Sequence, residues 1–270
     1  MTDRFKLLCV LAHPDDETLG CGGLIVWSVA HDIDVYLICA TRGERGWTGS
    51  EEDNPGLEAL GQIREAELRE AAQVLGIHEV TLLDFMDGDL DRADPAEAIG
   101  QIAYNVRRIQ PQVVVTFDCF GAYGHPDHIA VSQFTHAALV CAADRSYRDP
   151  GDQPPYRVAK LYWQVDTQDL ADQFSALMGG PLSMSIDGET REWTPFPEWS
   201  ITTRLDATTY SQTVRRAVQC HRSQLPTLPD MDQLSDEQHQ LFWGKPTLYL
   251  VCSLVDAGRG VEHDLFAGLR

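Results

Sequence analysis

The sequence predicts an α/β fold in which a mostly parallel sheet is covered by helices on both faces. From residue 5 to about residue 142, short apolar runs alternate with longer segments of helical periodicity, a rhythm typical of parallel strands joined by crossover helices. The chain has 270 residues, of which 43% are hydrophobic. This is enough to bury one large core, although two small domains would also fit the length. We therefore expect a single Rossmann-like domain.

Four apolar runs in the first half predict strands, at 5–12, 33–40, 79–85 and 112–118. A helix is expected at 57–76, where the apolar residues have helical spacing and Gly76 suits a helix stop. A second helix is expected at 95–109, because Pro95 is favoured in a first turn. The remaining expectations are a strand at 158–165, loops or short hairpins at 170–200, a helix at 207–224 and a final strand at 246–255.

Composition excludes several classes of protein. Forty-one acidic residues against 21 basic ones give a formal charge of −20, which repels nucleic acids and anionic membranes over most of the surface. The N-terminal residues do not follow the pattern of a secretory signal, and no 18 apolar residues stand together, so we expect a soluble, cytoplasmic protein without stable membrane insertion. The seven cysteines are scattered and form no CxxC pair, which argues against both a disulfide framework and a thiolate metal site.

The segment AHPDDE (12–17) follows the first predicted strand, at the edge where open α/β sheets bind their ligands. Pro14 is suited to the first turn of a helix. In such a turn His13 and Asp16 share a face, whereas Asp15 projects elsewhere. A histidine nitrogen and a carboxylate oxygen are plausible ligands of a zinc-like ion, although acids in a first turn also occur simply because they favour the helix dipole.

A second segment repeats the H-P-D frame after the fourth predicted strand, in FDCFGAYGHPDH (117–128). If the strand order is 3-2-1-4, the first and fourth strands are neighbours and the loops that follow them meet where the order reverses. A pair of histidines three residues apart is weak evidence by itself. Together, the two segments predict a metal site, and spacing alone leaves both His125 and His128 open as ligands.

These two segments resemble the motifs of the LmbE-like or PIG-L family, zinc-dependent de-N-acetylases that act on N-acetylglucosamine conjugates. Supporting matches cover most of the chain: TRGERG (41–46), IREAEL with LG at 75–76, LLDFMDGDL (82–90) and CHRSQ (220–224). The resemblance implies one domain over 1–270. Its 1–145 part is the core that carries both metal motifs, and 146–270 completes the fold and the substrate pocket.

The resemblance also implies the metal ligands, which are His13, Asp16 and His128. Three protein ligands leave a position for water, as in catalytic rather than structural zinc sites. One Zn²⁺ per chain is expected, although two imidazoles and one carboxylate do not distinguish zinc from ferrous iron.

Catalytic roles follow from the same motifs. Asp15 is the expected general base, since it lies next to a ligand but faces away from the metal. His125, with help from Tyr123, is expected to stabilise the oxyanion together with the zinc. Asp127 is expected to orient His125 and keep it protonated.

Other candidates carry weaker signals. Arg64 and Asp87 match positions near the sugar site of the family, but a solvated helix arginine and a turn aspartate explain them equally well. We expect His221 to be a packed or surface residue and Glu17 to support the first turn by hydrogen bonding. The glycines after the first motif do not form G-x-G-x-x-G, so a dinucleotide site is not supported.

The expected function is zinc-dependent hydrolysis of an N-acetyl group on a small amino-sugar conjugate. Two alternatives stay open: an amidase that cleaves a larger acyl group, like the mycothiol-conjugate amidases, and a metal-binding homologue without turnover, against which intact Asp15 and His125 argue. The remainder of the conjugate is expected to be recognised by variable loops, notably 41–56 and 170–200, where Trp47, Trp193 and Trp199 lie. The oligomeric state, including a homo-oligomer, is left open.

Overall fold

The computed structural model describes residues 4–180, 183–186, 188–228, 233–258 and 260–270. Its central sheet has seven strands in the order β3-β2-β1-β4-β5-β9-β8, and β6 and β7 form a separate hairpin. The strands are β1 (Lys6–Leu11), β2 (Asp34–Thr41), β3 (Glu79–Phe85), β4 (Val113–Phe117), β5 (Lys160–Val165), β6 (Ser183–Ile186), β7 (Glu189–Glu192), β8 (Thr203–Arg204) and β9 (Thr247–Ser253).

The sheet is mostly parallel, as predicted. The strands β3, β2, β1, β4 and β5 pair in parallel, and β9 joins β5 and β8 in antiparallel register. β1 pairs on both sides, with Leu7 opposite Val35 in β2 and Val113 in β4. The predicted order 3-2-1-4 is therefore confirmed, and it places the reversal of strand order between β1 and β4.

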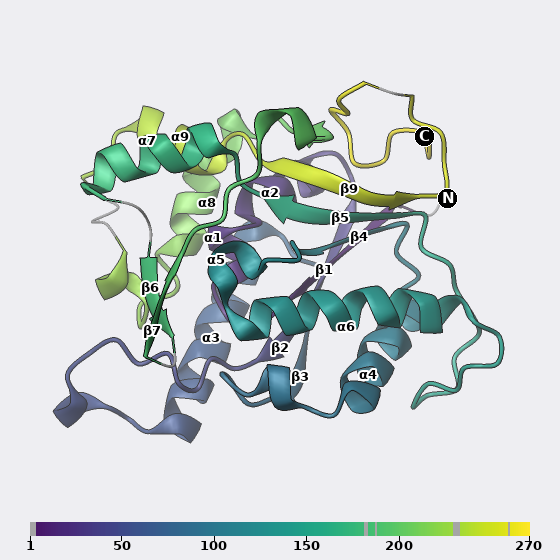
Figure 1. Ribbon diagram of the computed structural model, residues 1–270, viewed down its shortest axis with the longest axis horizontal. Coiled ribbons are helices and arrows are strands. Elements are labelled where there is room, and N and C mark those ends of the chain that lie inside the picture. Colours follow the sequence, from purple (N-terminus) through teal and green to yellow (C-terminus); the bar gives the residue numbers. More distant parts are fainter. Residues whose placement is uncertain (1–3, 181–182, 187, 229–232, 259) are drawn as a thin grey trace.

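Helices cover both faces of this sheet (Figure 1). The helices that connect β1, β2 and β3 lie on one face, and those that connect β3, β4 and β5 lie on the other. α2, α3 and α8 pack together on the first face, and α4 and α6 pack together on the second. The helices are α1 (Asp16–Leu19), α2 (Gly22–Ala30), α3 (Leu57–Leu75), α4 (Pro95–Ile109), α5 (Gly121–Gly124), α6 (Pro126–Ala143), α7 (Gln168–Met178), α8 (Ser211–Val218) and α9 (Asp236–Trp243).

Short 3-10 turns connect several of these elements. They are η1 (Glu51–Asp53), η2 (Leu90–Arg92), η3 (Glu198–Ser200), η4 (Thr208–Tyr210) and η5 (Leu225–Thr227). Two of the α-helices begin or end as the local sequence predicts. The side chain of Asp94 accepts a hydrogen bond from the Ala96 N–H ahead of Pro95, and Gly76 closes α3 in the left-handed conformation at φ 81°.

The second half differs from expectation in two places. The helix expected at 207–224 is shorter in the structure, where α8 ends at Val218. Tight turns follow it, in which Cys220 N–H donates to Ala217 O and His221 N–H donates to Val218 O. The segment expected to hold loops or hairpins at 170–200 contains most of α7 as well as the β6–β7 hairpin, while residues 181–182 and 187 lie outside the described residues.

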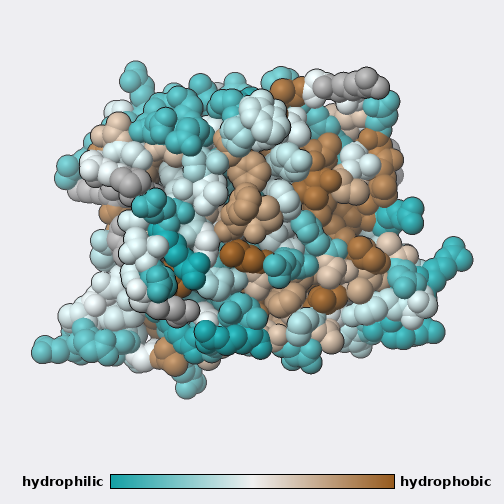
Figure 2. Space-filling view, in the orientation of Figure 1, coloured by the Kyte–Doolittle hydropathy of each residue, from teal (hydrophilic) through white to brown (hydrophobic). Residues whose placement is uncertain are grey.

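The surface is largely polar in Figure 2, as the net charge requires. Apolar surface gathers on this face over β5, β9 and the end of α6, where Val140, Leu161, Val251 and Leu254 line a shallow groove. Across the described residues no helix combines the length and the apolar character needed to cross a bilayer.

Candidate metal centre and active site

The loop after β1 folds the first motif back over the strand end. The backbone N–H groups of Ala12 and His13 donate to Asp16 Oδ2 at 3.2 and 2.7 Å. This requires a sharp turn at Asp15, whose φ is 118°, a value that side-chain-bearing residues rarely adopt and that costs about 1–3 kcal/mol. Glu17 stabilises the turn because its Oε2 accepts the Asp15 N–H at 2.9 Å, the supporting contact expected of it.

The loop after β4 is organised by Asp118, a residue that the motifs did not single out. Its carboxylate accepts the N–H groups of Phe120 and Ala122, at 2.6 and 3.1 Å, and thereby shapes the turn that precedes α6. A side chain at Gly121, where φ is 66°, would place its Cβ 3.0 Å from His128 Cβ. The position of Asp118, directly after a buried strand, was the available signal.

His13, Asp16 and His128 present a compact set of donor atoms. His13 Nδ1 lies 3.2 Å from His128 Nε2 and 3.7 Å from Asp16 Oδ2, and His128 Nε2 lies 3.5 Å from Asp16 Oδ1. The ligands of a tetrahedral ion with bonds of about 2.0–2.1 Å are separated by about 3.3–3.4 Å. The two imidazole nitrogens are close to this separation, and each lies near one oxygen of the Asp16 carboxylate, Oδ2 for His13 and Oδ1 for His128, so the set suits a single small divalent cation.

The electrostatics of the set also suit a cation. Burial raises the pKa of Asp16 to about 7, and nearby Asp15 adds to the shift against the opposing charge of His13. Burial, together with His13 and His125, lowers the pKa of His128 well below its ordinary value, so its imidazole is neutral and able to bind a metal. A positive ion between these groups would relieve the repulsion between the carboxylates.

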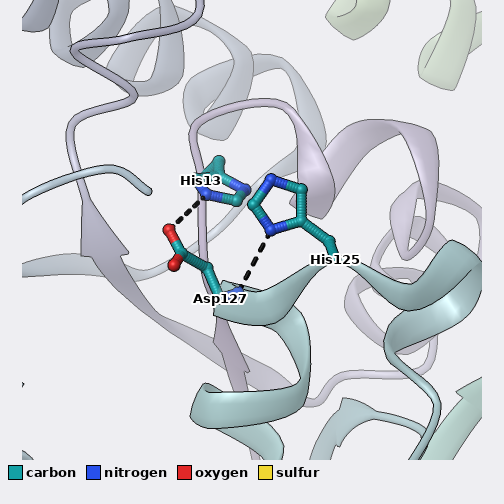
Figure 3. Close-up of side chains that lie close together, drawn as sticks. All are labelled: His13, His125 and Asp127. Atoms are coloured by element: carbon teal, nitrogen blue, oxygen red, sulfur yellow. Dashed lines mark hydrogen bonds and ion pairs between the residues drawn. The ribbon is translucent and has the colours of Figure 1, made fainter. Parts of the chain in front are cut away.

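The other ring nitrogen of His13 faces two buried carboxylates. His13 Nε2 lies 3.1 Å from Asp127 Oδ2 (Figure 3) and 3.1 Å from Asp87 Oδ1. If Nε2 carries the proton and donates it to them, Nδ1 is left as the atom that faces Asp16 and His128, as in the carboxylate–histidine–metal arrangements of zinc enzymes. Burial opposes the charge on His13, but its bonds to Asp127 and Asp87 raise its pKa well above the ordinary value.

Asp127 was expected to orient His125, and the structure corrects this. The Asp127 carboxylate bonds to His13 and accepts the N–H groups of Gly88 and Leu90, at 2.7 and 3.1 Å. His125 instead caps α6: its Nδ1 accepts the backbone N–H of Asp127 at 3.1 Å (Figure 3). Burial and the neighbouring His13 lower the pKa of His125 to about 4, so it is not held protonated.

The cap nevertheless equips His125 as a donor. Since Nδ1 accepts a hydrogen bond, the neutral ring carries its proton on Nε2. A second group of possible ligands, His13, His125 and Asp127, also lies within 4.8 Å. It is less suited to an ion, because both carboxylate oxygens of Asp127 accept a backbone N–H and His125 Nδ1 is occupied, whereas the two backbone N–H groups on Asp16 both donate to Oδ2.

Asp15 lies beside the donor set without joining it. Its Oδ2 accepts a hydrogen bond from Arg64 Nη2 at 3.1 Å. Burial raises the pKa of Asp15 above its ordinary value, although Arg64 and His221 act in the opposite direction. A carboxylate with a raised pKa is a stronger base than a solvated one.

Arg64 was matched to the sugar site, but its contacts are with the protein. It is buried, and its guanidinium donates to Gly43 O at 3.0 Å and Pro14 O at 2.6 Å as well as to Asp15. The glycines of TRGERG make room for it, since a Cβ at Gly43 or Gly46 would lie 2.3 or 2.1 Å from Arg64 Nη1. The motif on the loop after β2 and the motif on α3 thus form one support for Asp15.

Asp87 and Tyr123, also expected at the site, both lie there. Asp87 accepts the Arg45 N–H at 3.0 Å besides facing His13. Burial opposes ionisation of Asp87, but the contact with His13 outweighs it and lowers the pKa. The Tyr123 ring lies edge-on to His125 and His128, with centroids 6.0 and 5.3 Å apart, and burial raises the pKa of its hydroxyl, which therefore stays a donor.

His221 is packed, one of the two outcomes expected, and its partner is Glu17. Its Nε2 lies 2.7 Å from Glu17 Oε1, and both side chains are buried. Burial favours the neutral form of Glu17, but the contact with His221 outweighs burial and lowers the pKa of Glu17. Burial likewise favours the neutral form of His221, but the contact with Glu17 outweighs burial and raises the pKa of His221. The pair connects the C-terminal half to the turn that carries Asp15, a contact that spacing over 204 positions could not reveal.

The chain is similar to known proteins along its whole length. Residues 8–139 match the family model PIG-L, described as GlcNAc-PI de-N-acetylase. Over the whole chain, the sequence is 34% identical to 1D-myo-inositol 2-acetamido-2-deoxy-alpha-D-glucopyranoside deacetylase of Rhodococcus jostii (strain RHA1), covering 99% of that protein. The chain belongs to the PIG-L family. The resemblance drawn from the two H-P-D segments is thereby confirmed.

Another curated protein and a solved structure are also similar to this chain. Mycothiol S-conjugate amidase of Streptomyces coelicolor is 28% identical over all of this chain and 99% of its own length. The structure of N,N'-diacetylchitobiose deacetylase from Pyrococcus horikoshii superposes with a TM-score of 0.68 at 19% identity, covering 92% of this chain and 84% of that one. The last comparison supports the fold alone, which is the α/β arrangement predicted from the sequence.

Proposed function

We propose that this chain is a zinc-dependent N-deacetylase that removes the acetyl group from a small amino-sugar conjugate. The observation that carries the proposal is the convergence of one possible ligand atom each from His13, Asp16 and His128 within 4.8 Å, with Asp15 beside them but outside the set. The names of relatives that match along the full chain, among them the Rhodococcus deacetylase, support the N-acetyl sugar as substrate.

The donor set fits zinc, since two imidazoles and one carboxylate leave a fourth position for water or substrate. A bound divalent ion would acidify a water molecule and polarise the amide carbonyl. The Nε2 contacts of His13 with Asp127 and Asp87 orient the ring for this task. Ferrous iron is compatible with the same donors, and elemental analysis of purified protein distinguishes the two.

The residues of the chain carry the proton transfers. Arg64 holds Asp15 Oδ2, which leaves Oδ1 to accept a proton from the attacking water and return it to the leaving nitrogen. The Nε2–H of His125 donates to the carbonyl oxygen as negative charge develops there, and the neutral Tyr123 hydroxyl assists. A carbon–oxygen bond forms, the carbon–nitrogen bond breaks, and acetate and a free amine leave.

A second candidate is an amidase that releases a larger acyl group. It is favoured by the match to the Streptomyces mycothiol S-conjugate amidase, which also extends over the whole chain. Both candidates use the same site and differ only in the acyl pocket. A panel of glucosamine derivatives with acetyl, butyryl and aminoacyl groups separates them, because the deacetylase loses activity as the acyl group grows and the amidase gains it.

The test of the main proposal pairs metal analysis with acetate release. Protein purified in metal-replete buffer is expected to hold one zinc per chain and to release acetate from N-acetylglucosamine conjugates. Protein that holds metal but releases no acyl group from any member of the panel would be a binding homologue. The intact base and the Nε2–H donor argue against that outcome.

The cysteines and the net charge bear on the compartment and on the class of substrate. All seven cysteines are free, which suits a reducing compartment such as the cytoplasm. A small-molecule substrate, rather than nucleic acid, agrees with the net charge of −20.

A further inference from the structure

The β6–β7 hairpin lies against the loop that carries His125, in a sheet of its own (Figure 1). Two hydrogen bonds join the hairpin and the residues that follow it to this loop. Arg191 Nη1 donates to Gly124 O at 2.8 Å, and Thr194 N–H donates to Ala122 O at 2.8 Å. Every other side chain of β7 is exposed, whereas Arg191 is half-buried. Arg191 is therefore the side chain that β7 directs towards the site loop.

Most of the donors on Arg191 have no hydrogen-bond partner among the described residues. Among the described residues no carboxylate forms an ion pair with it, although the chain has 41 acidic residues, and its Nε is buried without a hydrogen-bond partner. Arg107 shows what a structural arginine of this chain looks like. Its guanidinium is buried, pairs with Asp149 at 2.7 Å and donates to five backbone carbonyls.

The charge of Arg191 acts on the active-site side of the loop. A Cβ on Gly124, the residue before His125, would lie 3.5 Å from Arg191 Nη1. The positive charge of Arg191 also contributes to the lowered pKa of His125, after burial and His13. The nearby cations are already engaged, since Arg64 pairs with Asp15 and Arg45 pairs with Asp89.

We propose that Arg191 forms a subsite for an anionic group, a carboxylate or a phosphate, on the conjugate next to the acetylated sugar. The inference rests on the proposed deacetylase function and names the class of substrate. A guanidinium binds either anion through two parallel hydrogen bonds, and its bond to Gly124 O fixes its position in advance. In a chain of net charge −20, such a cation favours an anionic conjugate that the rest of the surface repels.

Three glycosides of N-acetylglucosamine test the subsite: the neutral methyl glycoside, the carboxymethyl glycoside and the 1-phosphate. We expect wild-type kcat/KM to be about tenfold to a hundredfold higher for at least one anionic compound than for the methyl glycoside. Arg191→Gln should remove this preference through a higher KM, while its kcat/KM for the methyl glycoside changes less than about threefold. Arg191→Lys should retain part of the preference. Comparing the two anions shows which source of negative charge the subsite favours.

The control is Arg148→Gln, which removes the same charge from a side chain that is 79% exposed and paired with Asp152. It should leave the preference unchanged. Damage to the loop would lower activity on all three compounds equally. The ratio of kcat/KM for an anionic glycoside to kcat/KM for the methyl glycoside therefore reports recognition of charge.

Hydrolysis of the methyl glycoside without any preference for the anions would overturn the subsite and leave the deacetylase intact. If no compound is hydrolysed, the proposed function fails, and calorimetry with N-acetylglucosamine 1-phosphate then tests the subsite alone. Equal affinity for wild type and Arg191→Gln would overturn it, whereas weaker binding by the variant would support it.

Discussion

Asp15→Asn tests the assignment of the base, because the substitution removes the proton acceptor and little else. Asparagine keeps the shape of the side chain and an oxygen for Arg64 Nη2, and Arg64 retains its bonds to Gly43 O and Pro14 O. Asparagine also tolerates positive φ better than most residues, so the turn at 118° should persist. The donor atoms of His13, Asp16 and His128 are not altered.

The expected loss in kcat is about a thousandfold. General base catalysis contributes about 10²–10⁴-fold, which corresponds to about 3–5 kcal/mol of barrier. The middle of this range is expected because the raised pKa of Asp15 makes it an effective base, while the cation and the Nε2–H of His125 would remain in the variant. The measurement is single-turnover acetate release, with zinc content determined on the same samples.

The matched control is Asp32→Asn, which makes the same change at another aspartate with positive φ, 60°, whose side chain is 84% exposed. It should behave as wild type. If Asp15→Asn binds one zinc per chain and turns over within tenfold of wild type, Asp15 is not the base. If it loses zinc, Asp15 belongs to the coordination set and the donor geometry has been misread.

Three other predictions concern the metal, the oxyanion and the buried pair. Zinc affinity should fall at least about tenfold per pH unit below 7, because Asp16, with a pKa of about 7, and His13, whose pKa is raised, must each lose a proton to bind; a competing chelator between pH 5.5 and 8 measures this. His125→Ala should lower kcat about 10²–10³-fold with zinc content unchanged, and His125→Gln, which keeps a donor, should lose less. Glu17→Gln should lower the free energy of unfolding by about 3–5 kcal/mol in urea titrations, since it leaves His221 buried without its charge partner.

The pH dependence of the last effect follows from both partners. The pKa of Glu17 is lowered in the fold, so its contribution is present above the ordinary value of 4.5 and is lost as pH falls through the folded value. The pKa of His221 is raised, so its contribution is present below 6.5 and is lost as pH rises through the folded value. The difference between wild type and Glu17→Gln should therefore be largest between pH 4.5 and 6.5.

Each of these three predictions has an outcome that contradicts it. A zinc affinity that is flat from pH 5.5 to 8 would mean that neither Asp16 nor His13 releases a proton when the metal binds. Loss of zinc in His125→Ala would favour the alternative ligand group of His13, His125 and Asp127. A difference in unfolding free energy that is constant with pH would show that Glu17 acts through packing rather than through its charge.

The parts of the fold that depend on local pattern were predictable from the sequence. Apolar runs gave the strands β1 to β5, and Gly76 and Pro95 gave the limits of α3 and α4. The repeated H-P-D frame then located the two strands, β1 and β4, whose following loops meet at the site. The helix at 207–224 was overestimated because helical periodicity continues past Val218, whereas the buried contact of His221 with Glu17 lies in the turn that follows the helix.

The partners of the site residues were harder to predict, because a motif gives spacing and not the direction of each ring nitrogen. Asp127 follows His125 by two positions, yet its carboxylate bonds to His13, which lies 114 positions away. Arg64 reads as a solvated helix residue by periodicity. The structure shows that Gly43 and Gly46 leave room for its guanidinium, a relation that the spacing of the two motifs does not reveal.

The contacts of Asp15 explain why motifs so far apart occur together in this chain. The turn at Asp15 has a costly φ and is held on two sides, by Arg64 of α3 on the side chain and by Glu17 on the backbone N–H. Glu17 is in turn held by His221, so the C-terminal half stabilises the base through a buried pair rather than by contact with the reacting atoms. A loss of either support should allow Asp15 to relax to negative φ and to leave its place beside the donor set, while His13, Asp16 and His128 stay together.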